Sequence, residues 1–284
     1  MGGNTMLTNF NSMLQTAYEQ KKAIGSFNFY NYETLKGILQ AAEQMNTPVI
    51  VSFGKKYLSN MSFDEVKAIT AASAAAFKTN VCLHLDHCDN MEIIYQAIRA
   101  GFTSVMYDGS ALPFEENAAN TEHICKVAHA SGVSVEAELG SLAAGESSHE
   151  GSADDIEVYT NPDAAKEFVG KTGVDALAVS IGTVHGLYKG TPNIRTDILQ
   201  TINEKLCMPL VLHGGSGTPE AKVKECISNG IAKINVNTEI SDYTVQHTRA
   251  LLEKENPHLS VVALNQMQYV SEVVQKYMKI FANI

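Results

Sequence analysis

The stretch Leu83-His84-Leu85-Asp86-His87, together with the segments that follow it, decides the fold that we predict. It closes a short apolar run (81–87) that is typical of a buried strand. An amphipathic segment, Met91 to Ala100, comes next, and then a second strand-like run, Ser104 to Asp108. A strand, a helix and another strand in this order indicate a βαβ unit in a parallel sheet.

The same alternation continues along the chain and predicts eight strands. They are 23–29, 48–53, 81–87, 104–108, 134–139, 176–181, 209–213 and 232–236. The helices predicted between them are 32–45, 63–77, 91–100, 114–130, 164–172, 198–207 and 221–228. Eight strands that are apolar on both faces favour a closed (β/α)8 TIM barrel, a single domain over residues 1–284. The alternative is a doubly wound open sheet, but no strand-like run is followed by G-x-G-x-x-G.

Composition and charge exclude several kinds of partner. The chain has 284 residues, of which 45% are hydrophobic and 18% charged, as is usual for globular proteins. Its formal net charge of -10 argues against nucleic acid and against an anionic membrane. An anionic small molecule remains compatible with this charge, because a metal ion or a helix N-terminus creates a local positive potential.

The N-terminus and the cysteines indicate a cytoplasmic protein. Residues 1–6 lack the basic and apolar regions of a signal peptide, and Met6 is a candidate natural start. No apolar run approaches membrane-spanning length. The five cysteines form no CxxC pair and suggest no disulfide framework. Cys88 follows His87 and is a candidate metal ligand, but a reduced thiol is the simpler interpretation.

Three histidines stand just beyond separate strand-like runs: His87, His185 and His213. In a barrel, the C-terminal ends of the strands form one mouth, where the active site lies. Three imidazoles that meet there, with a fourth position open, are how catalytic zinc is held. The alternative is that each histidine only caps its own strand by hydrogen bonding.

Carboxylates accompany these histidines. Asp86 is the candidate general acid/base, and its alternative role is to hold a histidine tautomer. Glu136 and Glu138 point to the same face of their strand. One of them is expected to orient a histidine or to act as an alternative metal ligand, for which we name Glu138. For Glu136, a buried salt bridge is an equally good interpretation.

Two further segments indicate an anion site. Gly214, Gly215 and Ser216 form a glycine-rich turn, whose backbone N–H groups can bind phosphate. Asn237 and Thr238 follow the eighth predicted strand, and the loops after strands seven and eight commonly bind phosphate in barrels. The alternative is that Asn237 and Thr238 simply cap the next helix. Lys189 is a possible further cation. The long polar loop 140–161 is expected to be functional or mobile.

These motifs resemble the class II, metal-dependent fructose-bisphosphate and tagatose-bisphosphate aldolase family. The resemblance rests on six segments in order: 83–87, 105–110, 135–140, 181–186, 211–216 and 233–239. It implies reversible, zinc-dependent aldol cleavage of a ketose bisphosphate to dihydroxyacetone phosphate and an aldehyde such as glyceraldehyde 3-phosphate. It also implies Na⁺ or K⁺ near the phosphate, and a homodimer or larger homo-oligomer.

The resemblance also implies roles for individual residues. His87, His185 and His213 would bind zinc, Asp86 would act on the C4 oxygen of the substrate, and Glu146 would transfer a proton at C3. The residues implied for binding dihydroxyacetone phosphate are Gly186, Gly214, Gly215, Ser216, Asn235, Asn237 and Thr238.

Three departures from the family pattern leave the substrate open. The loop reads Ala143-Ala144-Gly145-Glu146 where two glycines are usual. Gly54, followed by Lys55-Lys56, takes the place of a serine or threonine. No arginine follows Arg249, so Lys55 or Lys56 would replace the arginine for the second phosphate, or the acceptor aldehyde is a different one.

Alternative functions follow from these departures. An aldolase of the same family could act on another ketose phosphate or on a phosphorylated sugar acid. A zinc hydrolase or epimerase and a non-catalytic zinc-containing sugar-phosphate sensor are the other hypotheses.

Overall fold

The computed structural model describes residues 7–75, 77–148, 158–188, 190 and 192–283. The predictions for residues 1–6 and for Lys189, and part of the prediction for the loop 140–161, lie outside these residues.

Eight parallel strands close into a barrel, as predicted. They are β1 (Ile24–Asn28), β2 (Val49–Gly54), β3 (Val81–Cys88), β4 (Ser104–Tyr107), β5 (Ser134–Leu139), β7 (Ala176–Val179), β9 (Leu210–Leu212) and β10 (Ile231–Val236). Their order around the barrel is β1-β10-β9-β7-β5-β4-β3-β2. The TIM-barrel prediction is therefore confirmed, and the open-sheet alternative is wrong.

The helices predicted between the strands are present, with ends that differ by a few residues. They are α2 (Tyr32–Met45), α3 (Phe63–Ala74), α4 (Met91–Ala100), α5 (Phe114–Ala130), α6 (Pro162–Thr172), α7 (Thr196–Leu206) and α8 (Glu220–Ser228). Local capping fixes their starts. Ser62 forms a capping box with Glu65, and Asn161 caps α6, which begins with Pro162.

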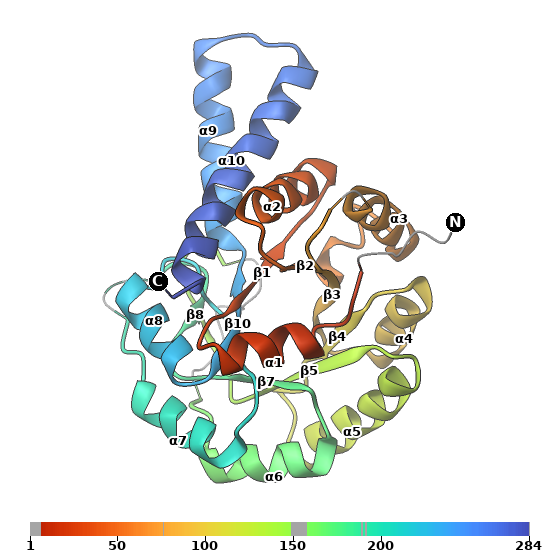
Figure 1. Cartoon of the computed structure of the whole chain (residues 1–284), viewed down its shortest axis with the longest axis vertical. Coiled ribbons are helices and arrows are strands. Elements are labelled where there is room, and N and C mark those ends of the chain that lie inside the picture. Colours follow the sequence, from red (N-terminus) through yellow and green to blue (C-terminus); the bar gives the residue numbers. More distant parts are fainter. Residues whose placement is uncertain (1–6, 76, 149–157, 189, 191, 284) are drawn as a thin grey trace.

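Two helices were not predicted, α1 (Asn11–Glu19) and α10 (Leu259–Phe281), and the helix considered after Asn237 and Thr238 had no predicted extent; it is α9 (Thr238–Lys254). The first buries only Met13, Leu14 and Ala17, which is too short a pattern to show a helical period. Figure 1 shows α9 and α10 as a helical hairpin that projects beyond the ring of helices around the barrel. Two short strands, β6 (Ala143–Ala144) and β8 (Val184–His185), form a separate parallel pair, and a short 3-10 helix, η1 (Lys55–Tyr57), follows β2.

The barrel interior is apolar at its N-terminal end and polar towards its C-terminal end. Figure 1 shows α1 lying across one end of the barrel. Phe10, which precedes α1, packs with Ile24, Ile50 and Cys82 in one apolar cluster inside the strands. One layer higher, the Phe10 ring lies 5.9 Å from that of the fully buried His84. The helix α1 therefore closes the N-terminal end of the barrel, and the polar groups gather at the C-terminal end.

The α9–α10 hairpin is fixed to the barrel where α10 crosses α2. Gly37 of α2 lies directly under α10, and a Cβ atom at this position would be 2.5 Å from the Met267 carbonyl oxygen and 2.7 Å from the Val270 Cβ. Val270 is fully buried. Close packing at this crossing thus depends on the absence of a side chain at residue 37.

Gly37→Ala is expected to lower the free energy of unfolding by about 1–3 kcal/mol, because the methyl group overlaps the α10 backbone. Gly170→Ala in α6 is the matched control, since a Cβ atom there meets nothing within 4 Å. Helix propensity predicts that this control gains up to about 1 kcal/mol. Thermal and urea denaturation of both variants measure the difference, and equal midpoints would contradict the packing argument.

Candidate metal and substrate site

Three predicted histidines meet at the C-terminal mouth of the barrel. His87 belongs to β3, His185 to β8, and His213 follows β9 directly. The ring centroid of His87 lies 4.9 Å from that of His185 and 4.5 Å from that of His213. One ring nitrogen from each histidine lies within 4.8 Å of the other two. This spacing allows all three to bind one metal ion.

The backbone at His87 is unusual. Its φ angle is +42°, in the left-handed region that non-glycine residues rarely adopt. The register between β3 and β4 also shifts between Leu85 and Cys88. Such an irregularity redirects a side chain at the rim of a barrel. It allows Asp86 and His87, although consecutive in a strand, to contribute to the same site.

Two carboxylates determine which nitrogens of the histidines face the centre. The Asp108 Oδ2 lies 3.0 Å from the Nδ1 of His87, and the Glu136 Oε1 lies 2.7 Å from the Nε2 of His213. The opposite nitrogens, His87 Nε2 and His213 Nδ1, then face each other at 2.8 Å. Among the described residues, the buried Nε2 of His185 has no hydrogen-bond partner. Three nitrogens converge, and two of them belong to rings whose opposite nitrogen contacts a carboxylate; this arrangement fits a zinc ion.

Glu138 and Cys88 differ as candidate ligands. Glu138 belongs to a second possible ligand group, with His87 and Asp108. Its Oε2 is buried and has no hydrogen-bond partner among the described residues. Burial and the neighbouring Asp108 carboxylate raise the pKa of Glu138 well above its usual value.

Cys88, the other candidate ligand, directs its thiol at the Asn90 carbonyl oxygen, 3.4 Å away, and burial raises the pKa of this thiol to about 11. The thiol therefore stays protonated.

Glu136 has both of the roles that the sequence left open. Besides His213, it contacts the buried Lys233, whose Nζ lies 2.8 Å from its Oε2. Burial alone would raise the pKa of Glu136, but the Lys233 ammonium outweighs this effect and holds the pKa at about 2. Glu136 is therefore ionised at neutral pH and accepts from His213.

Asp86 lies beside the three histidines and is almost completely buried. Its Oδ2 accepts from the Asn28 side chain at 2.9 Å, and its Oδ1 accepts from the Asn235 side chain at 3.0 Å. Burial would raise its pKa, but the positive charges of His87 and Lys233 together lower it. In the described residues, no hydrogen bond joins Asp86 to a metal-site histidine, so a tautomer-holding role is not what its contacts indicate.

The glycine-rich turn lies against the third histidine. Gly214 has a φ of +71°, and a Cβ atom there would be 2.2 Å from the Val184 carbonyl oxygen. The Gly215 N–H donates to the Asn235 carbonyl at 2.9 Å. These two contacts hold the turn between β8 and β10, at the same mouth as the histidines.

The start of α9 borders this turn. Asn237 occupies the N-cap position of α9, but its side chain makes no capping hydrogen bond. Its amide oxygen instead accepts from the Tyr30 hydroxyl, and its amide nitrogen donates to the Tyr57 hydroxyl at 3.3 Å. The alternative that Asn237 only caps the helix is therefore wrong.

The first turn of α9 also carries a negative charge. The Glu239 N–H donates to the Ser216 hydroxyl at 3.3 Å, and the Glu239 carboxylate accepts from the Gly217 N–H at the same distance. Lys276 neutralises this carboxylate at 2.5 Å. The positive end of the helix dipole thus remains next to Ser216 and Thr238.

Glu146 lies just beyond β6 and pairs with Leu187, which lies just beyond β8. Its N–H donates to the Leu187 carbonyl at 2.8 Å, and the Leu187 N–H donates back at 2.7 Å. Gly186 lies between the two chains with a φ of +107°, and a Cβ atom there would be 2.4 Å from the Glu146 carbonyl oxygen. The backbone of Glu146 is therefore fixed beside the histidines, while its side chain is exposed.

A lysine marks the rim next to Asp86. Gly54, the last residue of β2, is the register partner of Asp86, and Lys55 follows it directly. Lys55 forms an ion pair with the exposed Asp89. The role of Lys55 or Lys56 at the far end of a substrate stays a prediction.

Several site residues were not predicted from the sequence. Asp108, Asn28 and Lys233 had no assigned role, and the contact of Tyr30 with Asn237 was not foreseen. The position of Asp108, directly after a strand, was a signal of the same kind as that of His87. Lys233 gave no such signal, because a lysine within a strand is usually solvent-exposed.

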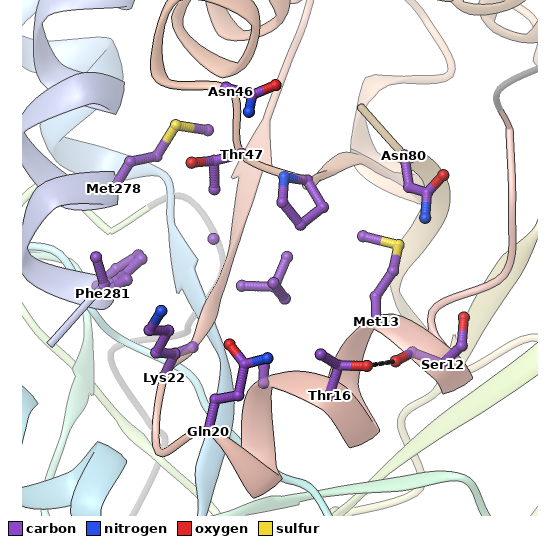
Figure 2. A pocket seen from close by; sticks show the side chains of 16 residues that line it. Ser12, Met13, Thr16, Gln20, Lys22, Asn46, Thr47, Asn80, Met278 and Phe281 are labelled. Atoms are coloured by element: carbon purple, nitrogen blue, oxygen red, sulfur yellow. Dashed lines mark hydrogen bonds between the residues drawn. The ribbon is translucent and has the colours of Figure 1, made fainter. Parts of the chain in front are cut away.

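A separate cavity of about 400 Å³ lies at the other end of the barrel. Figure 2 shows that its walls come from α1, the region before β2 and the end of α10. Lys22 is the one charged side chain that lines it, and no metal-binding group of the described residues lies there. Its lining does not suggest catalysis, so the C-terminal mouth remains the candidate site.

Among the described helices, including the long α10, none combines the length and the apolar character that a membrane span requires.

Comparisons with known proteins agree with this geometry. Residues 8–284 match the family model "Fructose-bisphosphate aldolase class-II". The chain is 44% identical to the "Probable fructose-bisphosphate aldolase" of Bacillus subtilis (strain 168) over 242 residues, which are 82% of each protein. It is 40% identical to the "Sulfofructosephosphate aldolase" of Alkalicoccus urumqiensis over 253 residues, covering 87% of this chain and 85% of that protein. The crystal structure of the YdjI aldolase from Escherichia coli K12 superposes with a TM-score of 0.85 at 34% identity, covering 97% of each chain.

Asp108→Ala is expected to weaken zinc binding by about 10–100-fold, because His87 loses the acceptor that orients its ring. Asp64→Ala, on the exposed first turn of α3, removes the same charge far from the mouth and serves as the control. Competition with a chromogenic chelator measures the affinity of each variant. Equal affinities for the two variants would contradict the orienting role of Asp108.

Proposed function

Because the chain belongs to the class II fructose-bisphosphate aldolase family, we propose that it is a zinc-dependent ketose-phosphate aldolase in which His87, His185 and His213 hold the metal. The observation that carries this proposal is the convergence of three imidazole nitrogens within 4.8 Å, directly beside the buried Asp86. A bound Zn²⁺ would supply Lewis acidity to the carbonyl oxygen of the substrate.

Asp86 and Glu146 are the proposed acid/base residues. In cleavage, Asp86 takes the proton of the C4 hydroxyl, and the C3–C4 bond breaks with its electron pair left on C3. Glu146 then protonates C3, which gives dihydroxyacetone phosphate and an aldehyde. In condensation, the two carboxyl groups act in reverse. The side-chain amides of Asn28 and Asn235 support this role, because they donate to the Asp86 carboxylate and fix it without protonating it.

The phosphate of dihydroxyacetone phosphate is proposed to bind between the glycine turn and α9. Gly186, Gly214, Gly215 and Ser216 would provide close backbone approach on one side. Asn237 and Thr238 would provide it on the other, at the positive end of the α9 dipole, and Asn235 would contribute from β10. A Na⁺ or K⁺ ion would help to neutralise the phosphate charge.

The substrate is proposed to be fructose 1,6-bisphosphate or tagatose 1,6-bisphosphate. Lys55, next to the register partner of Asp86, would then bind the distal phosphate in place of the missing arginine. The similarity to a sulfofructosephosphate aldolase makes a ketose phosphate with another distal anion the second candidate, since the same lysine would recognise a sulfonate. A phosphorylated sugar acid remains the third.

We also propose a cytoplasmic, homo-oligomeric enzyme. Support for the oligomer comes from the α9–α10 hairpin, where Leu259 and Leu264 are 78% and 64% exposed. Apolar side chains gathered on a projecting element are typical of protein interfaces.

The first test is a cleavage assay of the zinc-loaded protein with fructose 1,6-bisphosphate, tagatose 1,6-bisphosphate, a 6-sulfonated fructose 1-phosphate, fructose 1-phosphate and a phosphorylated deoxy-keto-gluconate. Release of dihydroxyacetone phosphate is expected from a doubly anionic ketose, and a chelator should abolish it. Borohydride should have no effect, because the mechanism forms no Schiff base. Absence of release from every compound by metal-loaded protein would favour the sensor or another zinc chemistry.

Asp86→Asn and Glu146→Gln should separate the two proton transfers. Asp86→Asn is expected to lower kcat for cleavage by about 10²–10⁴-fold, and to leave the exchange of the C3 proton of dihydroxyacetone phosphate with D₂O intact. Glu146→Gln should slow both reactions. NMR follows the exchange, and an Asp86→Asn variant that loses exchange as well would contradict the assignment.

Light scattering of the purified protein tests the oligomer. A dimer or larger assembly is expected, and Leu259→Glu with Leu264→Glu should shift the mass towards that of one chain. A monomeric wild-type protein would overturn this part of the proposal.

A further inference from the structure

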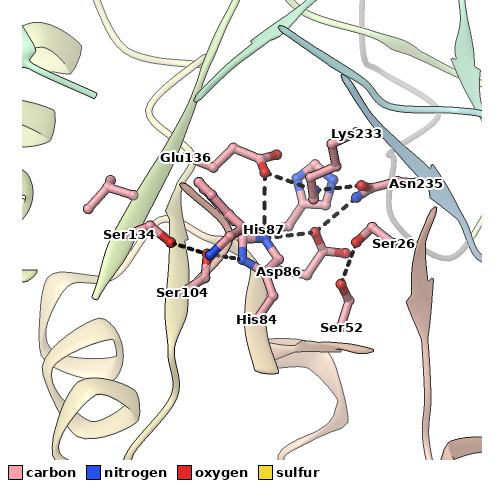
Figure 3. A network of polar contacts seen from close by, with 12 residues as sticks. Ser26, Ser52, His84, Asp86, His87, Ser104, Ser134, Glu136, Lys233 and Asn235 are labelled. Atoms are coloured by element: carbon pink, nitrogen blue, oxygen red, sulfur yellow. Dashed lines mark hydrogen bonds and ion pairs between the residues drawn. The ribbon is translucent and has the colours of Figure 1, made fainter. Parts of the chain in front are cut away.

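Lys233 lies in the centre of the barrel, where the proposed mechanism gives it no role. It belongs to β10 and its side chain is fully buried. Its Nζ lies 2.6 Å from the Oδ1 of Asn235 and 2.8 Å from the Oε2 of Glu136. Figure 3 shows Lys233 between these two residues, with Asp86 below them and joined to Asn235 by a dashed line. Lys233 therefore starts two series of polar contacts, which we call branches. The first runs through Asn235 to Asp86, and the second runs through Glu136 to His213.

The first branch fixes the orientation of an amide. An ammonium group only donates hydrogen bonds, so it must face the oxygen of the Asn235 amide. The nitrogen of the same amide then has to face Asp86, whose Oδ1 it reaches at 3.0 Å, and it lies at the longer distance of 3.5 Å from the Nδ1 of His213. Without Lys233, the buried oxygen of Asn235 would lose its donor, and the amide could rotate to present that oxygen to Asp86. Only the first orientation gives the carboxylate a donor.

We propose that Lys233 is a positioning residue for C–C bond cleavage, which acts on Asp86 through Asn235; this inference rests on the proposed aldolase function. Lys233 locks the Asn235 amide, and Asn235 together with Asn28 holds the Asp86 carboxylate from both sides. With both carboxylate oxygens anchored, the remaining lone pairs of Asp86 are left for the C4 hydroxyl of the substrate.

The second branch is the competing explanation. Through Glu136, which accepts from His213 at 2.7 Å, Lys233 would act on the metal site instead. The two branches affect different reactions. Cleavage needs the C4 hydroxyl and therefore Asp86, whereas exchange of the C3 proton of dihydroxyacetone phosphate involves no C4 oxygen. A residue that acts through Asp86 changes cleavage alone, and a residue that acts through His213 changes both.

The test uses a double variant in which both partners of the buried ion pair are neutral. Lys233→Met alone would leave Glu136 without a counter-ion, so it is combined with Glu136→Gln. The single variant Glu136→Gln is the control for the change at residue 136, because it keeps Lys233 and its contact with the Asn235 oxygen, and its own zinc content and unfolding midpoint report the cost of the unpaired ammonium. Three quantities are measured for both proteins: bound zinc per chain, kcat and KM for cleavage of the best ketose of the panel, and the rate of C3 proton exchange.

The expected result is that the double variant has the zinc content and the exchange rate of the control, with an unchanged KM. Its kcat for cleavage should fall by about 10²-fold, the lower range for loss of a general acid/base. Adding Asn235→Ala to both proteins should remove this difference, because the route from Lys233 to Asp86 is then already cut.

Three outcomes would overturn the role of Lys233. One is cleavage by the double variant at the rate of the control. Another is a parallel fall of cleavage, exchange and zinc content. The third is a kcat difference that persists with Asn235→Ala. A wild-type protein that neither cleaves a ketose phosphate nor exchanges the C3 proton would contradict the aldolase function itself, which is a separate result.

Discussion

Closure of the eight-stranded barrel is the constraint on which the rest of the structure depends. It turns alternate residues of all eight strands into one shared interior, where polar groups can be satisfied only by one another. The lower part of this interior is apolar and closed by Phe10 and α1. The upper part contains a lysine and a glutamate that are both fully buried, Lys233 and Glu136. Removing one partner of such a pair typically costs about 3–5 kcal/mol.

The buried pair of Lys233 and Glu136 also orients the side chains of the site. Glu136 turns the Nδ1 of His213 towards the other histidines, and Lys233 determines which side of the Asn235 amide faces Asp86. In the same way, Asp108 contacts the Nδ1 of His87 and turns its Nε2 towards the other histidines. The strained backbone of His87 then brings its ring to the common centre. Two of the three imidazoles thus have a carboxylate at their outer nitrogen, which orients the ring without occupying the centre.

The proposed phosphate site is tied to a different part of the fold. The helix α9 begins directly after β10, and its first turn faces Ser216, while its other end belongs to the projecting hairpin. Packing of α10 on α2 at Gly37 holds this hairpin against the barrel. The crossing at Gly37 thus fixes the hairpin at a distance from the mouth, and the contact with Ser216 fixes the first turn of α9 at the mouth itself.

The amino-acid sequence by itself determined the barrel and the identity of its mouth. The alternation of strands and helices is a local property, and so are the histidines at the ends of strands, because both follow from short-range periodicity and from the direction of parallel strands. The carboxylates Asp86, Glu136 and Glu138 were found in the same way.

Only the tertiary structure decided how these residues are paired. Lys233 lies 97 positions after Glu136 in the sequence, and no local pattern connects them. The same is true of His87 with Asp108, and of Tyr30 with Asn237. The helices α1 and α10 were missed because they close one end of the barrel and pack on α2, and these contacts exist only after the strands have closed. The residue type gives each side chain its donor or acceptor character, but the distances that select its partner in a buried interior exist only once the chain is folded.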